Sequence, residues 1–527
     1  LFARTEIVLA SKLRPATFDD FAHDTRKMRE WLASTIRERR SRRQKGIIVN
    51  FDAHDFDLDT EFFKIGTGSL GGKARGLAFA SNLLKRSTDL HAQHPGVNIM
   101  VPQSLVITTE GFDAFIEQNK LLELANNDLP DQEIARQFLK ASIPEWVKKD
   151  LTAYMRQVRH PIAIRSSSLL EDAQFRAYAG LYRTYMLPND CTDFSMRLEH
   201  LLAAIKLVYA STYFQGPKSF SQRVGHRTEE EKMAIIIQKM VGENYSGHFY
   251  PAISGVAQSH NYYPFSHMKP EEGIATIALG LGKMVVEGEK TLRFSPRYPQ
   301  LLPQRSTVED ILENAQRFFY SLRLNNDCPM LGTNDSENLE KREISDAETE
   351  PPVAMLSSTY VPAEHRIRDT VHVPGHRVLT FAQALKYNTF PLADILSEFL
   401  AIGEEGMGCP VELEFSVNLR KGDNGKPDFA VLQLRPMTAR AELETVNITD
   451  DEIEKAFCVS NHSLGNAVKT DITDVVYVKA DGFDPARTVA IAREIGEINN
   501  ILLKEGRKYL LVGPGRWGSA DRWLGIT

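Results

Sequence analysis

The sequence has few cysteines and lacks long apolar runs. Its 527 residues include four cysteines, Cys191, Cys328, Cys409 and Cys458. Because no two of them stand at CxxC spacing, a disulfide-rich scaffold and a cysteine-type zinc site are excluded, and a reducing compartment is favoured. The sequence also lacks a stretch of about 18 apolar residues and a signal-peptide pattern. We therefore expect a cytoplasmic protein without a membrane partner.

An excess of positive charge is lacking as well. The formal net charge is −6 and the isoelectric point is near 6.2, which argues against a nucleic-acid partner, because such affinity depends on neutralising phosphates. The length predicts about two to four domains, each with a core of its own. The chain begins at Leu1 rather than at Met and stops at "DRWLGIT", so we expect a piece of a longer polypeptide.

Strands and helices alternate throughout without internal repeats, which predicts an α/β or α+β class. The basic run of residues 37–45 is interpreted as a solvated helix end rather than as a phosphate-binding patch. The composition divides the chain into an N-terminal helical segment (residues 1–60), a first α/β part (61–327), a polar and acidic loop or linker (328–352), a second α/β part (353–440) and a C-terminal α/β domain of unassigned role (441–527).

A glycine-rich stretch, "GTGSLGGK", spans residues 66–73 and precedes a helical pattern. Glycines let backbone N–H groups converge on an anion, the start of a helix favours negative charge, and Lys73 adds a positive charge. The stretch is not a Walker A loop, because neither Ser nor Thr follows the lysine. It predicts a phosphate site, with a flexible surface turn as the alternative.

Arg165 comes directly after the short apolar strand "PIAI". Ligands of open α/β sheets bind where strands end, and a guanidinium suits a bidentate phosphate contact. The alternative for Arg165 is a surface salt bridge. The unbroken apolar run "KMAIIIQKMV" predicts a strand covered on both faces, and Gln238 with the neighbouring backbone could contact a nucleotide base.

Residues 411–436 predict a hairpin with unusual polar side chains. Side chains alternate along a strand, so Glu412 and Glu414 share a face, as do Gln433 and Arg435. A turn at the Asp-Asn-Gly sequence would place Glu412 near Arg435 and Glu414 near Gln433. Adjacent carboxylates repel unless a cation lies between them, and Mg²⁺ prefers oxygen ligands together with substrate phosphates. Together with the glycine stretch, the hairpin predicts a site for a nucleoside triphosphate with Mg²⁺; the alternative is an exposed hairpin with cross-strand ion pairs.

Five motifs resemble, in the same order, the N-terminal PEP/pyruvate-binding, nucleotide-binding domain of the phosphoenolpyruvate synthase and pyruvate phosphate dikinase family. They are "GTGSLGGKARGL", "IAIRSSSLLEDAQFRAYAGLYRTYM", "IIIQKMV", "GLGKMVVEG" and "VELEFSV…FAVLQLRPMTAR", and they span roughly residues 62–440. The resemblance implies an ATP-grasp fold whose two subdomains close on ATP. Residues 61–327 would carry the phosphate loop and the adenine side, and residues 353–440 would carry the metal ligands.

The resemblance also implies roles for single residues. The cations of catalysis would be Lys73, Arg165 and Arg435, the ATP-binding residues would be Gly71, Gly72, Lys73, Arg165, Gln238, Lys239, Met240, Gln433 and Arg435, and the magnesium ligands would be Glu412 and Glu414. Glu412 stands where the family has the Asp of its D-x-E pair. Gln433 and Arg435 match the family's Q-x-R-P ending.

The chain departs from the family at two places. Lys283 follows "GLG" where the family usually has Glu, and Glu287 or Glu289 would have to compensate. The segment "YSGHFYPAISG" also lacks the family's usual "GVxFTxxP" wording. Both departures affect substrate contacts and rate more than ATP binding.

The family's phosphohistidine motif, similar to "TSHAA", and its pyruvate-binding barrel are missing from the sequence. We expect a phosphohistidine domain in cis or in trans as the partner, and pyruvate or phosphoenolpyruvate to act through another domain. The neighbours and spacing of His365, His372 and His376 are typical of structural or surface histidines.

The C-terminal "LLVGPGRWGS" spells G-x-G-x-x-G with Gly513, Gly515 and Gly518. A dinucleotide fingerprint would need a helix next and an acidic residue about 20 positions further on. Because the chain ends soon after, we expect a tight turn that packs Trp517.

The leading interpretation is an ATP-dependent phosphotransferase module that uses Mg·ATP and passes phosphate to a histidine elsewhere. Two alternatives stay open: a non-catalytic nucleotide-sensing module, and an ATP-grasp ligase that activates a carboxylate.

Overall fold

The computed structural model describes residues 48–527 apart from thirteen gaps. The gaps are residues 54–59, 126, 128, 169–180, 225–230, 263, 265–266, 303–304, 325–330, 421–424, 438–447, 460–468 and 519–524, together with the last residue, 527. Three expectations fall outside the described part. They concern the basic run of residues 37–45, most of the N-terminal helical segment, and the first residues of the Asp-Asn-Gly turn.

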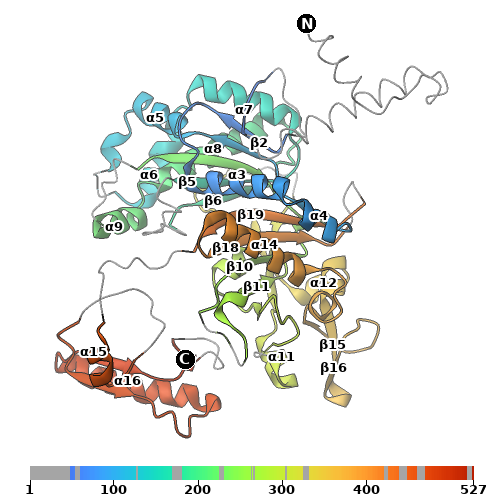
Figure 1. The fold of residues 1–527 in the computed structure, drawn as a ribbon. Coiled ribbons are helices and arrows are strands. Elements are labelled where there is room, and N and C mark those ends of the chain that lie inside the picture. The colour runs from blue at the N-terminus through green and yellow to red at the C-terminus, as the bar shows by residue number, and fades with distance from the viewer. Residues whose placement is uncertain are drawn as a thin grey trace.

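The upper half of the molecule is a mixed six-stranded sheet with helices on both faces (Figure 1). Its strands, in spatial order, are β1 (Val49–Asn50), β2 (Phe62–Ile65), β4 (Ser104–Ile107), β7 (Met233–Lys239), β5 (Ile162–Ser168) and β6 (Thr184–Leu187). Strand β7 is buried along almost its whole length, as its unbroken apolar run predicts. One apolar core joins this sheet to the helices α5 (Thr109–Gln118), α6 (Asp131–Lys140), α7 (Glu145–Gln157) and α8 (Phe194–Ser211).

A second six-stranded sheet lies below the first. Its order is β12 (Leu292–Phe294), β11 (Ile274–Ala278), β10 (Ile253–Gln258), β18 (Val411–Asn418), β19 (Asp428–Pro436) and β3 (Asn98–Met100). All neighbours are antiparallel except β19 and β3. Helix α3 (Gly71–Arg86) lies between the two sheets, and α14 (Leu392–Met407) packs on the second sheet beside it (Figure 1).

Two smaller sheets complete the lower half. The first runs in the order β14 (Leu339–Glu343), β13 (Phe318–Arg323), β9 (His248–Tyr250) and β8 (Glu243–Tyr245), and the second in the order β16 (Arg366–Arg368), β15 (Ser357–Val361) and β17 (His376–Leu379). Shorter helices and 3₁₀ turns lie between the elements of the two halves: α4 (Thr88–Gln93), α9 (Gln215–Val224), α10 (Lys283–Val286), α11 (Val308–Asn314), α12 (Pro351–Leu356), α13 (Ala382–Leu385), and the 3₁₀ turns η2 (Leu122–Ala125), η4 (Pro270–Glu272), η6 (Ile344–Ala347) and η7 (Pro362–Glu364).

Strand β14 corrects the expectation of a loop or linker over residues 328–352. It pairs with β13 along its whole length. Its inward side chain is Arg342, which forms an ion pair of 2.8 Å with Glu350, and Tyr250 donates a hydrogen bond to the same carboxylate. The one buried residue of this strand is the charged Arg342, so its composition did not indicate a strand in a sheet.

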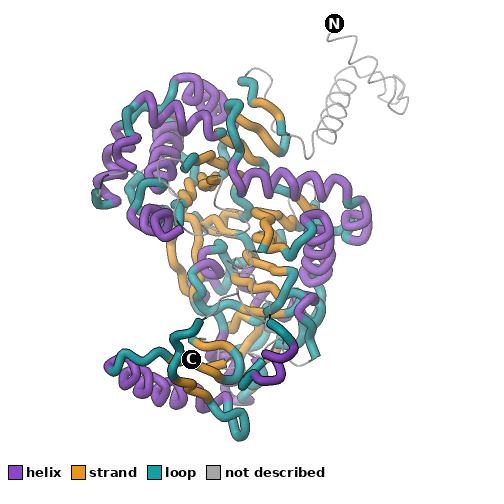
Figure 2. The backbone as a smooth tube through the Cα atoms, turned by 60° about the vertical axis from the view of Figure 1, so that its left-hand side comes forward, coloured by secondary structure: helices purple, strands orange, loops and turns teal. Residues whose placement is uncertain are grey.

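The C-terminal unit, for which an α/β domain was expected, has a β-α-β order (Figures 1 and 2). Helix α16 (Thr488–Lys504) connects the parallel strands β20 (Asp474–Tyr477) and β21 (Tyr509–Val512), and the 3₁₀ turn η8 (Pro485–Arg487) precedes it. The short strands β22 (Arg516–Trp517) and β23 (Gly525–Ile526) follow, and α15 (Asp450–Lys455) lies ahead of the unit in the chain.

Three sequence expectations concern cysteines, histidines and membrane spans. Cys191 is disulfide-bonded, which the absence of CxxC spacing did not predict, whereas Cys409 and Cys458 are free. His365, His372 and His376 are exposed, as expected for surface histidines. Within the described ranges, none of the helices combines the length and the apolar composition that a bilayer crossing requires.

Candidate functional site

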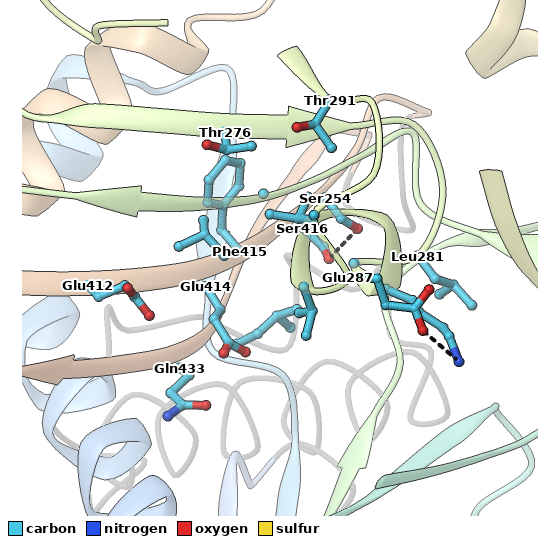
Figure 3. A pocket seen from close by; sticks show the side chains of 18 of the residues that line it. Ser254, Thr276, Leu281, Glu287, Thr291, Glu412, Glu414, Phe415, Ser416 and Gln433 are labelled. Carbon is cyan, nitrogen blue, oxygen red and sulfur yellow. Dashed lines mark hydrogen bonds and ion pairs between the residues drawn. The ribbon is translucent and has the colours of Figure 1, made fainter. Parts of the chain in front are cut away.

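The two six-stranded sheets face each other across a large cavity. Its volume is about 1720 Å³, which exceeds the roughly 300–1,000 Å³ of ordinary small-molecule pockets. Side chains from β5, β7, β10, β11, β18 and β19 line it, together with α10 and the turn that follows. Figure 3 labels residues of β10, β11, β18 and β19 among them. The cavity therefore has room for a nucleotide and for a second group that approaches it.

Most of the site residues named from the sequence meet in this cavity. Its walls include Lys73, Arg165, Gln238, Lys239, Met240, Glu412, Glu414, Gln433 and Arg435. Gly71 and Gly72 are buried at the start of α3 and do not line it. Eight basic and five acidic side chains line the cavity, and this positive excess suits an anionic ligand.

The hairpin pairs in the register that the sequence predicted. Glu412 lies opposite Arg435, and Glu414 lies opposite Gln433. The hairpin is not exposed, because β18 lies inside the second sheet between β10 and β19. The guanidinium of Arg435 donates from Nε to Oε1 of Glu412 at 2.9 Å, and Gln258 of β10 donates to Oε2 of Glu412 at 2.7 Å. Sequence reasoning missed Gln258, whose position is set only by the pairing of β10 with β18.

A β-bulge in the hairpin positions Arg165. The register shifts between Glu414 and Phe415, so the pairing passes over Leu432. Such a bulge turns a backbone group away from the ladder, and the carbonyl of Leu432 accepts a hydrogen bond of 2.9 Å from Nη1 of Arg165. The first sheet is thereby joined to the second at the residue that the sequence proposed as a phosphate contact.

Arg165 also binds three side chains around the cavity. Its Nη2 lies 2.8 Å from Oε2 of Glu414 and donates to Oε1 of Gln433 at 3.1 Å. Its Nη1 donates to Oε1 of Gln238 at 3.1 Å. Gln238 therefore orients Arg165, a role that competes with the base contact expected for its side chain.

Glu414 is ionised at neutral pH. Burial of the carboxyl opposes ionisation, but the positive charges of Arg165, Lys73 and Arg435 outweigh burial and hold its pKa below the ordinary value. Lys73 reaches this group from the start of α3 and donates to Oγ of Ser166 at 3.3 Å. Three cations and two carboxylates from four segments of the chain are thus brought together.

The glycine stretch makes local contacts that its composition did not predict. The backbone N–H groups of Thr67 and Ser69 donate to Glu110 at 2.6 Å and to Thr109 at 3.0 Å. Gly71 has a φ of +74°, and a Cβ there would overlap the carbonyl group of Ser167. The stretch therefore fixes the start of α3 against β5 and delivers Lys73 to the cavity, and these two amides bind protein side chains.

Lys283, which departs from the family pattern, lies on the opposite wall. It donates to Ser336, forms an ion pair of 3.4 Å with Glu287 and lies 5.3 Å from the centre of the Tyr320 ring. Figure 3 marks the ion pair of Glu287 with a dashed line, and Glu287 lines the cavity. Glu289 also lines the cavity, but Lys341 binds its carboxylate at 2.6 Å. Glu287 therefore places a carboxylate on this wall, one helical turn after Lys283.

Two serines of the cavity floor were not singled out from the sequence. Ser254 of β10 and Ser416 of β18 lie 3.2 Å apart, as Figure 3 shows, and Ser254 donates to the carbonyl of Gly280 at 2.7 Å. They lie opposite each other in the register of β10 and β18, two strands that are far apart in the sequence. The sequence carried no stronger signal for them.

Comparison with known proteins finds one nucleotide-binding family and several phosphotransferases. The family model described as "Pyruvate phosphate dikinase, AMP/ATP-binding domain" matches residues 67–456. An uncharacterized phosphotransferase of Bacillus subtilis is 28% identical over 194 residues, 36% of this chain and 20% of that protein. The rifampicin phosphotransferase of Bacillus subtilis is 26% identical over 169 residues, 29% of this chain and 19% of that protein.

The phosphoenolpyruvate synthase of Aeropyrum pernix is 23% identical over 243 residues, 42% of this chain and 26% of that protein. The matched regions span about a fifth to a quarter of these relatives. The family model, by contrast, covers most of this chain and contains the cavity-lining residues from Lys73 to Arg435. The chain therefore belongs to the pyruvate phosphate dikinase AMP/ATP-binding domain family.

Proposed function

We propose that the chain is an ATP-dependent phosphotransferase module with an ATP-grasp fold, and that Mg·ATP binds in the cavity between the two large sheets. The observation that carries this proposal is the meeting of Lys73 and Arg165 with the carboxylates of Glu412 and Glu414 on one wall. Cations suit the phosphates, and paired carboxylates suit a hard metal ion. Membership of an AMP/ATP-binding family supports the same ligand.

The donor set fits Mg²⁺. Magnesium is commonly held by one or two carboxylates, with substrate phosphates and water as its other ligands, and Glu412 and Glu414 are two carboxylates on alternate residues of one strand. No cluster of three or more acidic, histidine or cysteine ligands occurs among the described residues. A metal that shares its coordination with ATP is therefore favoured over a metal held by the protein alone. When bound, it would neutralise charge on the phosphates.

Binding of Mg·ATP would require an exchange of ion pairs. Arg165 and Arg435 now neutralise Glu414 and Glu412. Phosphate oxygens would take over the two guanidinium groups, and the carboxylates would turn to the metal. Lys73 would hold the phosphate chain from the side of α3, and the positive charges would stabilise the transferred group by position and electrostatics.

The phosphate acceptor in this proposal is a histidine on another domain or partner, and pyruvate or phosphoenolpyruvate would enter through a further domain. The size of the cavity supports the approach of such a group. The proposed division of the chain keeps residues 61–327 and 353–440 as the two parts of the ATP-grasp fold. Strand β14 now belongs with the first part, because it pairs with β13.

The test is nucleotide chromatography after incubation of the chain with Mg·ATP, with and without pyruvate. Formation of AMP supports dikinase-type transfer, and ADP alone supports a single transfer. Release of ADP only with a carboxylate and an amine would instead support a ligase. Failure of the chain to bind Mg·ATP in calorimetry would overturn the proposal.

A nucleotide-sensing module is the second candidate, and Lys283 favours it. This lysine stands on the cavity wall where the family usually has Glu, and it is engaged with Glu287 and Ser336. Tight binding of ATP without any turnover, even with a phosphohistidine domain added in trans, would support sensing over transfer.

A further inference from the structure

The C-terminal unit contributes a turn to the cavity wall. Residues Gly515–Gly518 line the same cavity as Lys73 and Glu414, although the unit lies far along the chain from the two large sheets. The turn belongs to the G-x-G-x-x-G stretch. That stretch is not a dinucleotide fingerprint, because Arg516 and Trp517 form strand β22 inside the motif. The function proposed above leaves this turn without a role.

The turn has a fixed shape. Strand β22 pairs in parallel with β23, with Arg516 opposite Gly525 and Trp517 opposite Ile526. A Cβ at Gly513 would lie 2.5 Å from the Trp517 ring, and a Cβ at Gly525 would overlap the backbone of Arg516. The glycines therefore allow close contacts that hold β22 in one position, as the tight turn expected around Trp517 requires.

This position sets the direction of Arg516. Successive side chains of a strand point to opposite faces. The Trp517 ring packs toward Gly513 and the buried Ile526, so Arg516 projects from the outer face of the unit, where it is exposed. Both residues line the cavity, and the guanidinium is thus carried on a rigid turn at its wall.

We propose that Arg516 contacts the phosphate groups of a nucleotide bound in the cavity, and that the C-terminal unit is thereby part of the nucleotide site. This inference rests on the proposed function of the cavity. A magnesium ion offsets only part of the negative charge of a triphosphate. A further guanidinium at the wall suits the remaining negative charge, because guanidinium–phosphate contacts are strong and directional.

The first test compares Arg516→Ala with Arg493→Ala by calorimetry with Mg·ATP on the full chain. Arg493 lies exposed on α16 of the same unit and does not line the cavity. We expect Arg516→Ala to weaken ATP binding about tenfold, the loss of one charged contact, and Arg493→Ala to leave it within about twofold. Equal affinities of the two variants and the unchanged chain would overturn the inference and leave the proposed function intact.

The second test uses Trp517 as a reporter. The chain has four tryptophans, and Phe in place of Trp31, Trp146 and Trp523 would leave Trp517 alone. We expect Mg·ATP to change its emission at the concentrations that saturate binding in calorimetry. Saturated binding without any change at Trp517 counts against the inference alone, whereas absence of ATP binding by the unchanged chain overturns both proposals.

Discussion

Nη2 of Arg165 lies 2.8 Å from Oε2 of Glu414. The two residues belong to different sheets, with Arg165 on β5 and Glu414 on β18. Both residues line the cavity, and their ion pair lies where phosphate and metal are proposed to bind. The same two side chains must therefore part, or change partners, before the site can work.

Glu414→Gln should abolish magnesium-dependent turnover of ATP while leaving the fold intact. The amide keeps the shape of the side chain but loses the charge that a hard cation needs, so we expect at least a roughly 100-fold loss of rate, the scale of losing a key electrostatic contact. Nucleotide chromatography measures the rate, and circular dichroism checks the fold. Glu405→Gln, on the exposed side of α14, is the matched control. Turnover equal to that of this control would reject the metal assignment.

Arg165→Ala should destabilise the chain by about 1–3 kcal/mol, because it leaves a partly buried carboxylate without its main cation. The pair is only 12% and 28% exposed. Lys232→Ala removes a pair with Asp113 that is 48% and 44% exposed, and this control should cost less than about 1 kcal/mol. Urea unfolding measures the free energy of unfolding of both variants. A cost of Arg165→Ala no larger than that of Lys232→Ala would show that the cavity pair does not stabilise the fold.

The stabilising effect of Glu414 should depend on pH. Its pKa in the folded chain lies below the ordinary value of 4.5, so its contribution is complete above pH 4.5 and is lost as the pH falls through the lower folded value. The difference in free energy of unfolding between the unchanged chain and Glu414→Gln should therefore shrink on acidification below pH 4.5. Urea titrations at neutral and acidic pH measure it, and a difference that grows on acidification would contradict the assigned sign.

Magnesium and ATP should bind interdependently. Without the metal, the carboxylates of Glu412 and Glu414 keep their arginines and repel the phosphates. We expect ATP affinity to fall about tenfold or more when EDTA replaces Mg²⁺, and reciprocity requires ATP to raise the affinity for Mg²⁺ by the same factor. Calorimetry in both orders measures the coupling. Equal ATP affinity with and without the metal would argue against the exchange of ion pairs.

Gly71→Ala should destabilise the chain by about 2–5 kcal/mol. The residue has a φ of +74°, and the added Cβ would overlap the carbonyl of Ser167, so strain and steric overlap add. Gly96→Ala is the control, because a Cβ there meets no atom within 4 Å. Chemical denaturation of the two variants compares the costs, and similar stabilities would mean that α3 can shift away from β5 without penalty.

The hairpin of β18 and β19 could be predicted from the sequence because alternation and antiparallel pairing are local rules. They placed Glu412 opposite Arg435 without knowledge of the rest of the fold. The bulge that turns Leu432 toward Arg165 could not be predicted, since it depends on how two distant sheets meet. The mixed class of the fold followed from the pattern of elements in the same way.

Other features depended on contacts between distant segments. Strand β14 was taken for a loop, because its one buried residue is the charged Arg342, which pairs with Glu350. The phosphate site of the glycine stretch stays a prediction, but the binding of the Thr67 and Ser69 amides to Glu110 and Thr109 of α5 could not be predicted locally. The cavity itself needs both sheets, and motif order along the chain gave no measure of its size.

Helix α3 has a mechanical consequence. A Cβ at Gly71 would overlap Ser167 of β5, and a Cβ at Gly76 would overlap the carbonyl of Leu434 on β19. The helix therefore packs between the two sheets with no space for a methyl group at either glycine, and Lys73 is held between the sheets with it. A motion that separated the two sheets would therefore have to break the contacts that α3 makes with β5 or with β19.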